Sequence, residues 1–177
     1  KASFNLNPAT HRAERHGGFN DKWGKVVQRL ARGELTSVYE GFTIANHSVS
    51  HPWPTRIPLA EWRREVVDGR KILQDWFQQP VSGFAYPFGD YNEATAAVVR
   101  EAGHVYARTT RDMTPCFPPE DAMAFHADTH FLKPDFWARY ERAKAAGGGV
   151  FYFWGHSFEL CTDEQWADFA AMIARIT

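Results

Sequence analysis

The stretch SGFAYPFGDYNEATAAVVREAGHVYAR, residues 82–108, decides the fold class of this chain. Its first part, SGFAYP (82–87), is a short apolar run that predicts a strand. NEATAAVVREAG (92–103) predicts a helix and ends at a glycine, a residue that commonly stops helices. HVYAR (104–108) then predicts another strand. A strand, a helix and a strand in this order predict parallel strands with the helix packed outside the sheet.

The same alternation continues in both directions along the chain. Further strands are predicted at ASFNL (2–6), EGFTIAN (40–46) and GVFYFWGHS (149–157), the last of them apolar enough to be buried on both faces. Helices are predicted where Trp23, Val26, Val27 and Leu30 recur at helical spacing up to Gly33, from Leu59 to Phe77, and around 133–149. A last helix is predicted after Thr162, which forms a capping box with Gln165, and its buried face would hold Trp166, Phe169, Met172 and Ile173. The predicted fold class is therefore α/β, a parallel sheet or barrel whose chemistry lies at the carboxyl ends of the strands.

Composition narrows the function further. The 177 residues suffice for one domain, and no linker or repeat divides residues 1–177. The formal net charge is −1 with both signs mixed along the chain, so no nucleic acid or anionic membrane is expected as a partner. The chain has no transmembrane-length apolar run and no signal-peptide pattern. Cys116 and Cys161 lack CxxC partners, which argues against a disulfide framework and a thiolate zinc site.

The first residues indicate an incomplete N-terminus. The chain has no initiator methionine and opens directly on KASFNLN (1–7), which already predicts a strand. We therefore expect the natural protein to begin further upstream. Because any export signal would lie there, the sequence does not predict a compartment.

NHSVSHPWP (46–54) places His47 and His51 four residues apart at the end of a predicted strand. A zinc-protease site is excluded, because HExxH needs a glutamate beside the first histidine and Ser48 stands there. Pro52 disfavours helical geometry at His51, so the pair is expected on a turn. Neutral imidazole suits zinc, but a catalytic site also needs a third ligand and an open position. Spacing alone leaves metal ligands and structural histidines as alternatives.

Two other histidine features accompany this pair. His126 and His130 repeat the same spacing in a predicted irregular loop, where metal binding is less expected. His156 follows FYFW at a predicted strand end, either as a structural residue or as a group placed for proton transfer. The pair in NHSVSHPWP, residues 86–90 and His156 all fall at predicted carboxyl ends of strands. This shared position is stronger support for a site than any single motif.

With its motifs in this order, the chain resembles the polysaccharide deacetylase family, the NodB homology domain of carbohydrate esterase family 4. KASFNLN resembles the family strand that follows its first motif, and NHSVSHP resembles the H-S/T-x-x-x-H metal motif. FAYPFGDYN (84–92) resembles the third motif, and FWGHS (153–157) resembles the last. The resemblance covers nearly the whole chain and implies a distorted (β/α) barrel.

The resemblance also implies an activity and its residues. The chain would be a metal-dependent hydrolase removing N- or O-linked acetyl groups from a carbohydrate, with zinc or another divalent transition metal as cofactor. His47 and His51 would bind the metal, and His156 would be the catalytic acid. The backbone N–H of Phe88 would help to hold the oxyanion. The side chains expected to shape the substrate pocket are those of Tyr86, Phe88 and Trp154.

The chain departs from the family pattern in several places. The family's Asp-Asp motif, which supplies the third metal ligand and the general base, would lie upstream of Lys1. The barrel strand that carries it is therefore expected to be missing here. Ala85 stands where many members have an arginine that orients the base. The tryptophan of the fourth motif is not evident, and Phe125 or Trp137 could replace it, with His130 lining the same region.

These departures keep other functions open. A catalytically degenerate domain of the same fold, which binds sugar without turnover, fits the absent aspartates and Ala85. A hydrolase of small non-peptide amides could use the same scaffold. If the histidines were purely structural, His47→Ala would leave the metal content unchanged. The sequence does not specify the sugar, its linkage or the oligomeric state.

Overall fold

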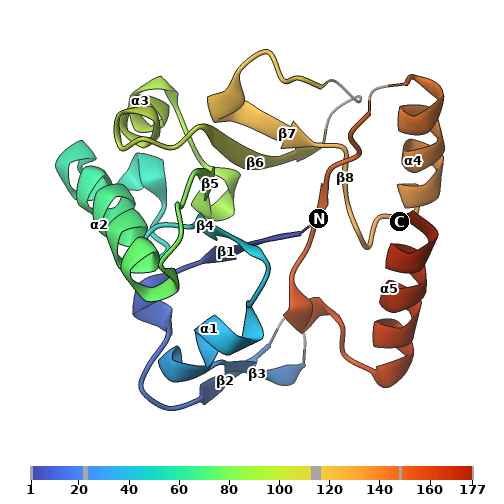
Figure 1. The fold of residues 1–177 in the computed structure, drawn as a ribbon, viewed down its shortest axis with the longest axis horizontal. Coiled ribbons are helices and arrows are strands. Elements are labelled where there is room, and N and C mark those ends of the chain that lie inside the picture. Colours follow the sequence, from blue (N-terminus) through green and yellow to red (C-terminus); the bar gives the residue numbers. More distant parts are fainter. Residues whose placement is uncertain (1, 22–23, 113–116, 148, 177) are drawn as a thin grey trace.

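The computed structural model of this chain describes residues 2–21, 24–112, 117–147 and 149–176. A five-stranded parallel sheet in the order β1-β4-β5-β6-β7 forms its centre (Figure 1). The strands are β1 (Ser3–Leu6), β4 (Thr43–Asn46), β5 (Gly83–Ala85), β6 (Tyr106–Asp112) and β7 (Phe125–Ala127). The prediction of an α/β fold with a parallel sheet is confirmed.

Helices flank this sheet on two sides (Figure 1). The α-helices are α1 (Leu35–Val38), α2 (Leu59–Phe77), α3 (Glu93–Glu101), α4 (Phe136–Ala145) and α5 (Asp163–Ile176). Short 3-10 helices span Pro8–Thr10, Arg32–Glu34, Pro54–Arg56, Pro87–Gly89, Ala122–Ala124 and Ser157–Glu159. Helices α2 and α3 pack side by side, whereas α4 and α5 lie on the opposite flank, beyond β8 (Figure 1). No helix in the described parts of the chain combines the length and apolarity needed to cross a membrane.

The main core lies between the sheet and the pair α2–α3. Trp62 and Val66 of α2, Phe84 of β5 and Val99 of α3 are all buried there. The indole N–H of Trp62 donates to the carbonyl of Thr95 at 3.1 Å and joins the two helices. Burial of these apolar side chains is the main stabilising term for this part of the fold. It also fixes the carboxyl end of β5, where the FAYPFG motif begins.

The helix predicted between β1 and β4 is wrong. Strands β2 (His16–Asn20) and β3 (Lys25–Arg29) form an antiparallel hairpin instead. Gly24, with φ of +59°, adopts a left-handed conformation that suits the reversal of the chain, and the β-branched valines of β3 favour a strand. Val26 is 59% exposed, so the apolar spacing did not mark a buried helix face. Trp23 lies outside the described residues.

The strand predicted at 149–157 is also wrong in extent and burial. Only Phe153–Trp154 form a strand, β9, which pairs with β8 (Thr129–His130), and both residues of β9 are half-exposed. This pair is separate from the main sheet, so hydrogen bonding across the described residues does not run continuously around a barrel. The irregular loop predicted around His126 and His130, between the strand at 104–108 and the helix around 133–149, contains both β7 and β8.

The last helix begins as predicted but is buried less than predicted. Thr162 and Gln165 form the capping box at the start of α5, with hydrogen bonds of 3.2 Å in each direction. On the expected buried face, however, Trp166 is 46% exposed, and Phe169 and Met172 are only half-buried. The helix lies at the edge of the molecule, where it is covered on one side alone (Figure 1).

Candidate functional site

His47 and His51 lie beside each other where β4 ends. Their ring centroids are 4.6 Å apart, and the ring planes meet at 77°. The backbone between them is a turn, since Ser48 and His51 both have φ of 66°. This geometry agrees with the predicted turn and brings the two imidazole rings side by side.

The ring of His47 is held by a single backbone group. Its Nδ1 lies 2.7 Å from the carbonyl oxygen of Ala85. Because a carbonyl can only accept, Nδ1 carries the hydrogen and Nε2 keeps its lone pair. Histidines that bind metals are commonly oriented in this way. The main chain of the FAYPFG motif therefore leaves Nε2 of His47 as the ring nitrogen that could bind a cation.

The protonation state of the histidine pair favours cation binding, whereas the charges of its neighbours oppose it. Burial lowers the pKa of His47 well below its usual value, and the charges of Arg108 and His51 lower it further. Burial also lowers the pKa of His51, with Arg29 and His156 acting in the same direction. Both rings are therefore neutral near neutral pH, which is the form that binds metals. The charged groups that lower these two pKa values most are all basic.

A buried amide network shapes the histidine turn. Asn46 donates through Nδ2 to the carbonyl of Val66 at 2.9 Å, and its Oδ1 accepts the N–H of Ser48 at 3.0 Å. The hydroxyl of Ser48 accepts the N–H of His51 at 3.0 Å. Asn7 donates to the carbonyl of Ser48 at 3.2 Å and to the preceding carbonyl. Because these partners come from β1 and α2 as well as from the turn, the packed fold holds the turn in place.

Aromatic rings extend the site outward from the histidines. The ring of Phe88 lies 4.5 Å from that of His51 and stacks at 4.0 Å on Trp53. The guanidinium of Arg56 lies 4.1 Å from the centre of the Trp53 ring. We call Arg56, Trp53 and Phe88 the aromatic stack. Phe88 is 47% exposed and Trp53 37%, so the edge of the stack faces solvent.

A carboxylate clamp joins the two loops that form the aromatic stack. Asp90 accepts the backbone N–H of Thr55 at 2.8 Å and its hydroxyl at 2.8 and 3.0 Å. Asp90 is therefore engaged between loops and is not placed as a metal ligand.

Left-handed backbone conformations gather at the site. Among the described residues, the non-glycine positions with positive φ are Ser48, His51, Gln78 and Phe88. Gln78 ends α2, whereas the others all lie on the two loops of the site. Such conformations cost about 1–3 kcal/mol each and concentrate at functional sites.

Tyr86 lies beneath the site instead of on its surface. Its side chain is fully buried, stacks on Tyr91 and donates to the carbonyl of Met123 at 2.9 Å. Burial raises the pKa of its hydroxyl. Tyr86 could therefore shape the predicted substrate pocket only by packing from below.

His156 lies at the exposed end of β9, with 42% of its side chain accessible. The ring of Trp154 lies 5.5 Å from His156 and 4.5 Å from His130. The guanidinium of Arg108 lies 5.0 Å from the centre of the Trp154 ring. His156 is also among the smaller causes that lower the pKa values of His47 and His51.

Glu159 connects His156 with His130. Its Oε1 lies 3.2 Å from Nδ1 of His156, and its Oε2 lies 3.0 Å from Nε2 of His130. Potential ligand atoms of the three side chains lie within 4.8 Å of one another, a grouping capable of holding a metal. His126, by contrast, approaches Thr109 at 2.5 Å. The sequence analysis did not select Glu159, for which the only signal is its place three residues after His156.

The residues considered as replacements for the fourth-motif tryptophan have different surroundings. Phe125 packs on Tyr152, and Trp137 packs on Phe136 and under Arg175. His130, which was predicted to line the region of that tryptophan, lies beside Trp154.

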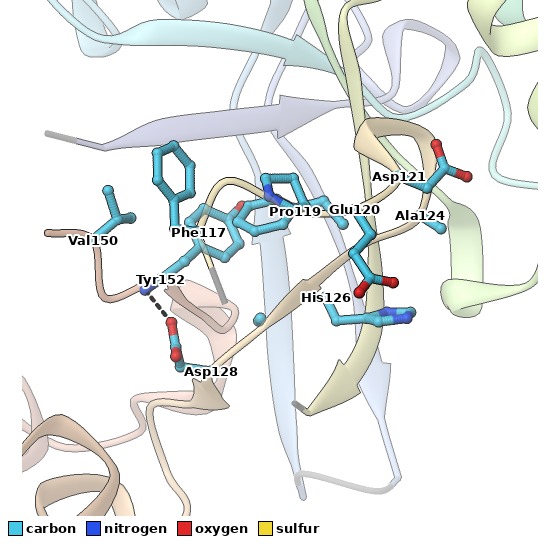
Figure 2. A pocket seen from close by; sticks show the side chains of 11 residues that line it. Phe117, Pro119, Glu120, Asp121, Ala124, His126, Asp128, Val150 and Tyr152 are labelled. Atoms are coloured by element: carbon cyan, nitrogen blue, oxygen red, sulfur yellow. Dashed lines mark hydrogen bonds between the residues drawn. The ribbon is translucent and has the colours of Figure 1, made fainter. Parts of the chain in front are cut away.

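The cavity drawn in Figure 2 does not include the histidine pair. Its volume is about 220 Å³. Its described lining residues are Phe117, Pro119, Glu120, Asp121, Ala124, Phe125, His126, Ala127, Asp128, Val150 and Tyr152. Asp128 accepts the N–H of Tyr152 there at 2.6 Å (Figure 2). Phe125 and His126, which the sequence raised as candidates, are among these lining residues, but the histidine pair, Tyr86, Phe88, Trp154 and His156 are not. The cavity is therefore separate from the candidate site.

Fold and site together define an α/β protein with a histidine pair at the carboxyl end of a central strand. Residues 12–107, more than half of the chain, match the family model described as "Polysaccharide deacetylase". The chain belongs to the polysaccharide deacetylase family. The matched range contains the histidine pair and the FAYPFG motif, whereas His156 lies beyond it.

Individual relatives are similar over parts of the chain. A Bacillus cereus peptidoglycan-N-acetylglucosamine deacetylase is 29% identical over 65 residues, which span 37% of this chain and 30% of that protein. The structure of Streptococcus pyogenes deacetylase PplD in complex with acetate covers 63% of this chain and 45% of its own, with 20% identity and a TM-score of 0.52. A putative polysaccharide deacetylase from Mycobacterium smegmatis covers 82% and 59%, with 17% identity and a TM-score of 0.55. The two structures support the fold.

Proposed function

We propose that this chain is a metal-dependent hydrolase that removes acetyl groups from an acetylated carbohydrate. His47 and His51 would bind zinc or another divalent transition metal. The observation that carries this proposal is the backbone hydrogen bond from Nδ1 of His47 to Ala85, which leaves Nε2 free beside His51. Membership of the polysaccharide deacetylase family supports the reaction class.

The residues would divide the chemistry as follows. With a divalent metal bound, the acetyl carbonyl is polarised and a water molecule is activated for attack. The backbone N–H of Phe88 would donate to the oxyanion that develops on the carbonyl oxygen. His156 would give a proton from its ring to the leaving nitrogen or oxygen. Trp154 and the exposed ring of Phe88 would contact the sugar, since aromatic faces pack well on sugar rings.

The third metal ligand and the general base would be carboxylates, as the resemblance to the family, with its Asp-Asp motif, implies. The charged groups named as lowering the pKa values of His47 and His51 are basic, and a carboxylate ligand would offset them. If no carboxylate joins the site, a domain that binds sugar without turnover is favoured.

The first test is metal content, measured by mass spectrometry on the purified chain. We expect near-stoichiometric zinc in the wild type and its loss in His47→Ala. His126→Ala is the matched control, because it removes the first histidine of the other HxxxH pair and should keep the metal. Acetate release from an N-acetylglucosamine oligomer and from O-acetylated xylan would then distinguish the two linkages.

Each other outcome has a defined meaning. No metal in the wild type would contradict the metal site in this chain. Metal without acetate release would favour the sugar-binding alternative. Turnover of a small amide with none of either polysaccharide probe would favour a non-sugar amidase.

A further inference from the structure

Glu159 is a buried acidic group in contact with His156, and both of its oxygens have partners. The residue is 7% exposed. Its Oε2 accepts the backbone N–H of His156 at 2.8 Å and lies 3.0 Å from Nε2 of His130. Its Oε1 lies 3.2 Å from Nδ1 of His156. A buried carboxylate with these contacts can act as a fixed acceptor for several donors at once.

The protonation state of this group follows from its hydrogen bonds. Burial alone would raise the pKa of Glu159, but hydrogen bonds from His130 and His156 outweigh burial and hold the pKa well below its usual range. The side chain is therefore an anion at neutral pH and accepts at both oxygens. Any ring nitrogen that faces it must carry a hydrogen.

His130 acts on this carboxylate as a neutral donor. The backbone N–H of Leu132 donates to Nδ1 of His130 at 3.2 Å. Since a backbone N–H can only donate, Nδ1 has no hydrogen, and the ring proton sits on Nε2, facing Glu159. A neutral ring leaves the negative charge of the carboxylate uncancelled.

The ring of His156 is fixed by its neighbours as well as by Glu159. Phe158 stacks on it at 4.7 Å and 21°, and Trp154 approaches it edge-on at 5.5 Å and 84°. With the ring plane set in this way, Nδ1 is directed at the carboxylate. Because the two ring nitrogens point in divergent directions, Nε2 is the one left for another partner.

We propose that Glu159 is a positioning residue that holds His156 with Nδ1 toward the carboxylate and Nε2 toward substrate, with His130 as the second donor that fixes Glu159. This inference rests on the proposed function, in which His156 is the proton donor. When the protonated ring gives its Nε2 proton to the leaving atom, the N–H bond breaks and an N–H or O–H bond forms there. The ring is left as the neutral Nδ1–H form, which is the form that Glu159 accepts.

Glu159→Gln is the decisive variant, because an amide cannot replace the carboxylate at every contact. Its single oxygen can keep the backbone N–H of His156 and Nε2–H of His130. Its NH₂ group then faces Nδ1 of His156, which must become an acceptor. We expect neutral His156 to switch from the Nδ1–H to the Nε2–H form, visible in long-range ¹H–¹⁵N NMR spectra. His156→Gln assigns the signals.

Kinetics give the second readout. If the chain is active, Glu159→Gln should lower kcat about 10- to 100-fold and change KM little, as expected for loss of a partner that orients a catalytic histidine. Glu164→Gln removes the same charge from an exposed position in the first turn of α5 and should leave both constants unchanged.

The outcomes separate this inference from the proposed function. A wild-type His156 in the Nε2–H form would overturn the role of Glu159 whether or not the variant folds. Equal kcat values in an active wild type and Glu159→Gln would overturn it too. Loss of one equivalent of zinc in Glu159→Gln would show that the three side chains are a metal site instead. No acetate release by the wild type would contradict the function, while the NMR result would still decide the tautomer.

Discussion

At the scale of single residues, Phe88 combines two roles in one position. Its ring joins Trp53 to His51, and its backbone has φ of 59° and ψ of 3°. A side chain with a Cβ is disfavoured in this left-handed conformation by about 1–2 kcal/mol. The ring contacts at the site therefore come with a local destabilisation of the fold.

Paired substitutions can measure this backbone strain. Phe88→Gly and Phe88→Ala both remove the ring, so their difference reports the backbone alone. We expect the glycine variant to be more stable by about 1 kcal/mol in denaturant unfolding. At Val105, which is exposed and not among the positive-φ residues, alanine should be the more stable replacement. Equal stabilities at position 88 would contradict the strain.

At the scale of elements, α2 and the histidine turn depend on one close approach. A Cβ at Gly69 would lie 2.6 Å from Oδ1 of Asn46 and 3.3 Å from the backbone carbon of Ser48. The absence of a side chain at Gly69 thus lets the helix touch the amide that holds the turn.

Gly69→Ala should therefore destabilise the protein, although the same change inside a helix normally stabilises it. We expect a loss of about 1–3 kcal/mol in the free energy of unfolding, as for other overpacked positions, and weaker metal binding as Asn46 moves. Asp68→Ala, at the neighbouring exposed position of α2, serves as the control and should leave both quantities nearly unchanged. Unchanged metal affinity in Gly69→Ala would show that Asn46 does not position the histidines.

The elements also show where sequence patterns suffice. Helices α2 and α3 and the strands beside them were predicted, because apolar spacing and a stop signal agree with the way they pack. The hairpin of β2 and β3 was missed, because Val26, Val27 and Leu30 fall at spacings that also fit a helix, although the ribbon buries little. The short pair β8–β9 was also predicted poorly, because β8 was missed and β9 was predicted to be longer than it is. Its pairing joins segments more than twenty residues apart, and no local pattern encodes that contact.

At the scale of the whole molecule, buried histidines couple stability to pH. His104 is 3% exposed, and its Nε2 accepts the amide of Asn46 at 3.2 Å. Burial, aided by the charge of Arg70, lowers its pKa to about 4. The unfolded chain takes up this proton near pH 6.5 and the folded chain only near pH 4. The folded state therefore loses stability as the pH falls through that window.

We expect His104 to account for up to about 3 kcal/mol of this loss between pH 6.5 and 4. His104→Gln keeps a polar partner for Asn46 but cannot titrate. Its stability should therefore fall less steeply than that of the wild type, as measured by urea unfolding at several pH values with metal removed. His47 and His51 have lowered pKa values as well. The stability of His104→Gln should therefore still fall with pH, but with a smaller slope than that of the wild type. Identical slopes in the two proteins would contradict the assignment.

The site as a whole could be predicted only where its residues are close in sequence. His47 and His51 share one turn, and Phe88 lies in a motif that can be read directly. Glu159 could not be selected, and its contact with His130 could not be predicted, because that contact depends on how β8 and β9 are brought together. Arg108 was missed because a charged residue in a strand gives no sign of lying buried against Trp154. Tyr86 was placed in the pocket, although its burial in the core can be seen only in three dimensions.

The left-handed positions Ser48, His51 and Phe88 also bear on how this sequence can change over generations. Selection for thermal stability alone would favour glycine at His51 and Phe88, because glycine adopts this backbone without strain, whereas the buried hydroxyl of Ser48 holds the turn. Selection for the reaction would keep the serine, the histidine and the aromatic ring. In a library of random variants, sorting for folding should enrich glycine at positions 51 and 88. Sorting for acetate release should instead enrich the residues now present. The residue enriched at each position would show whether stability or the reaction has selected it.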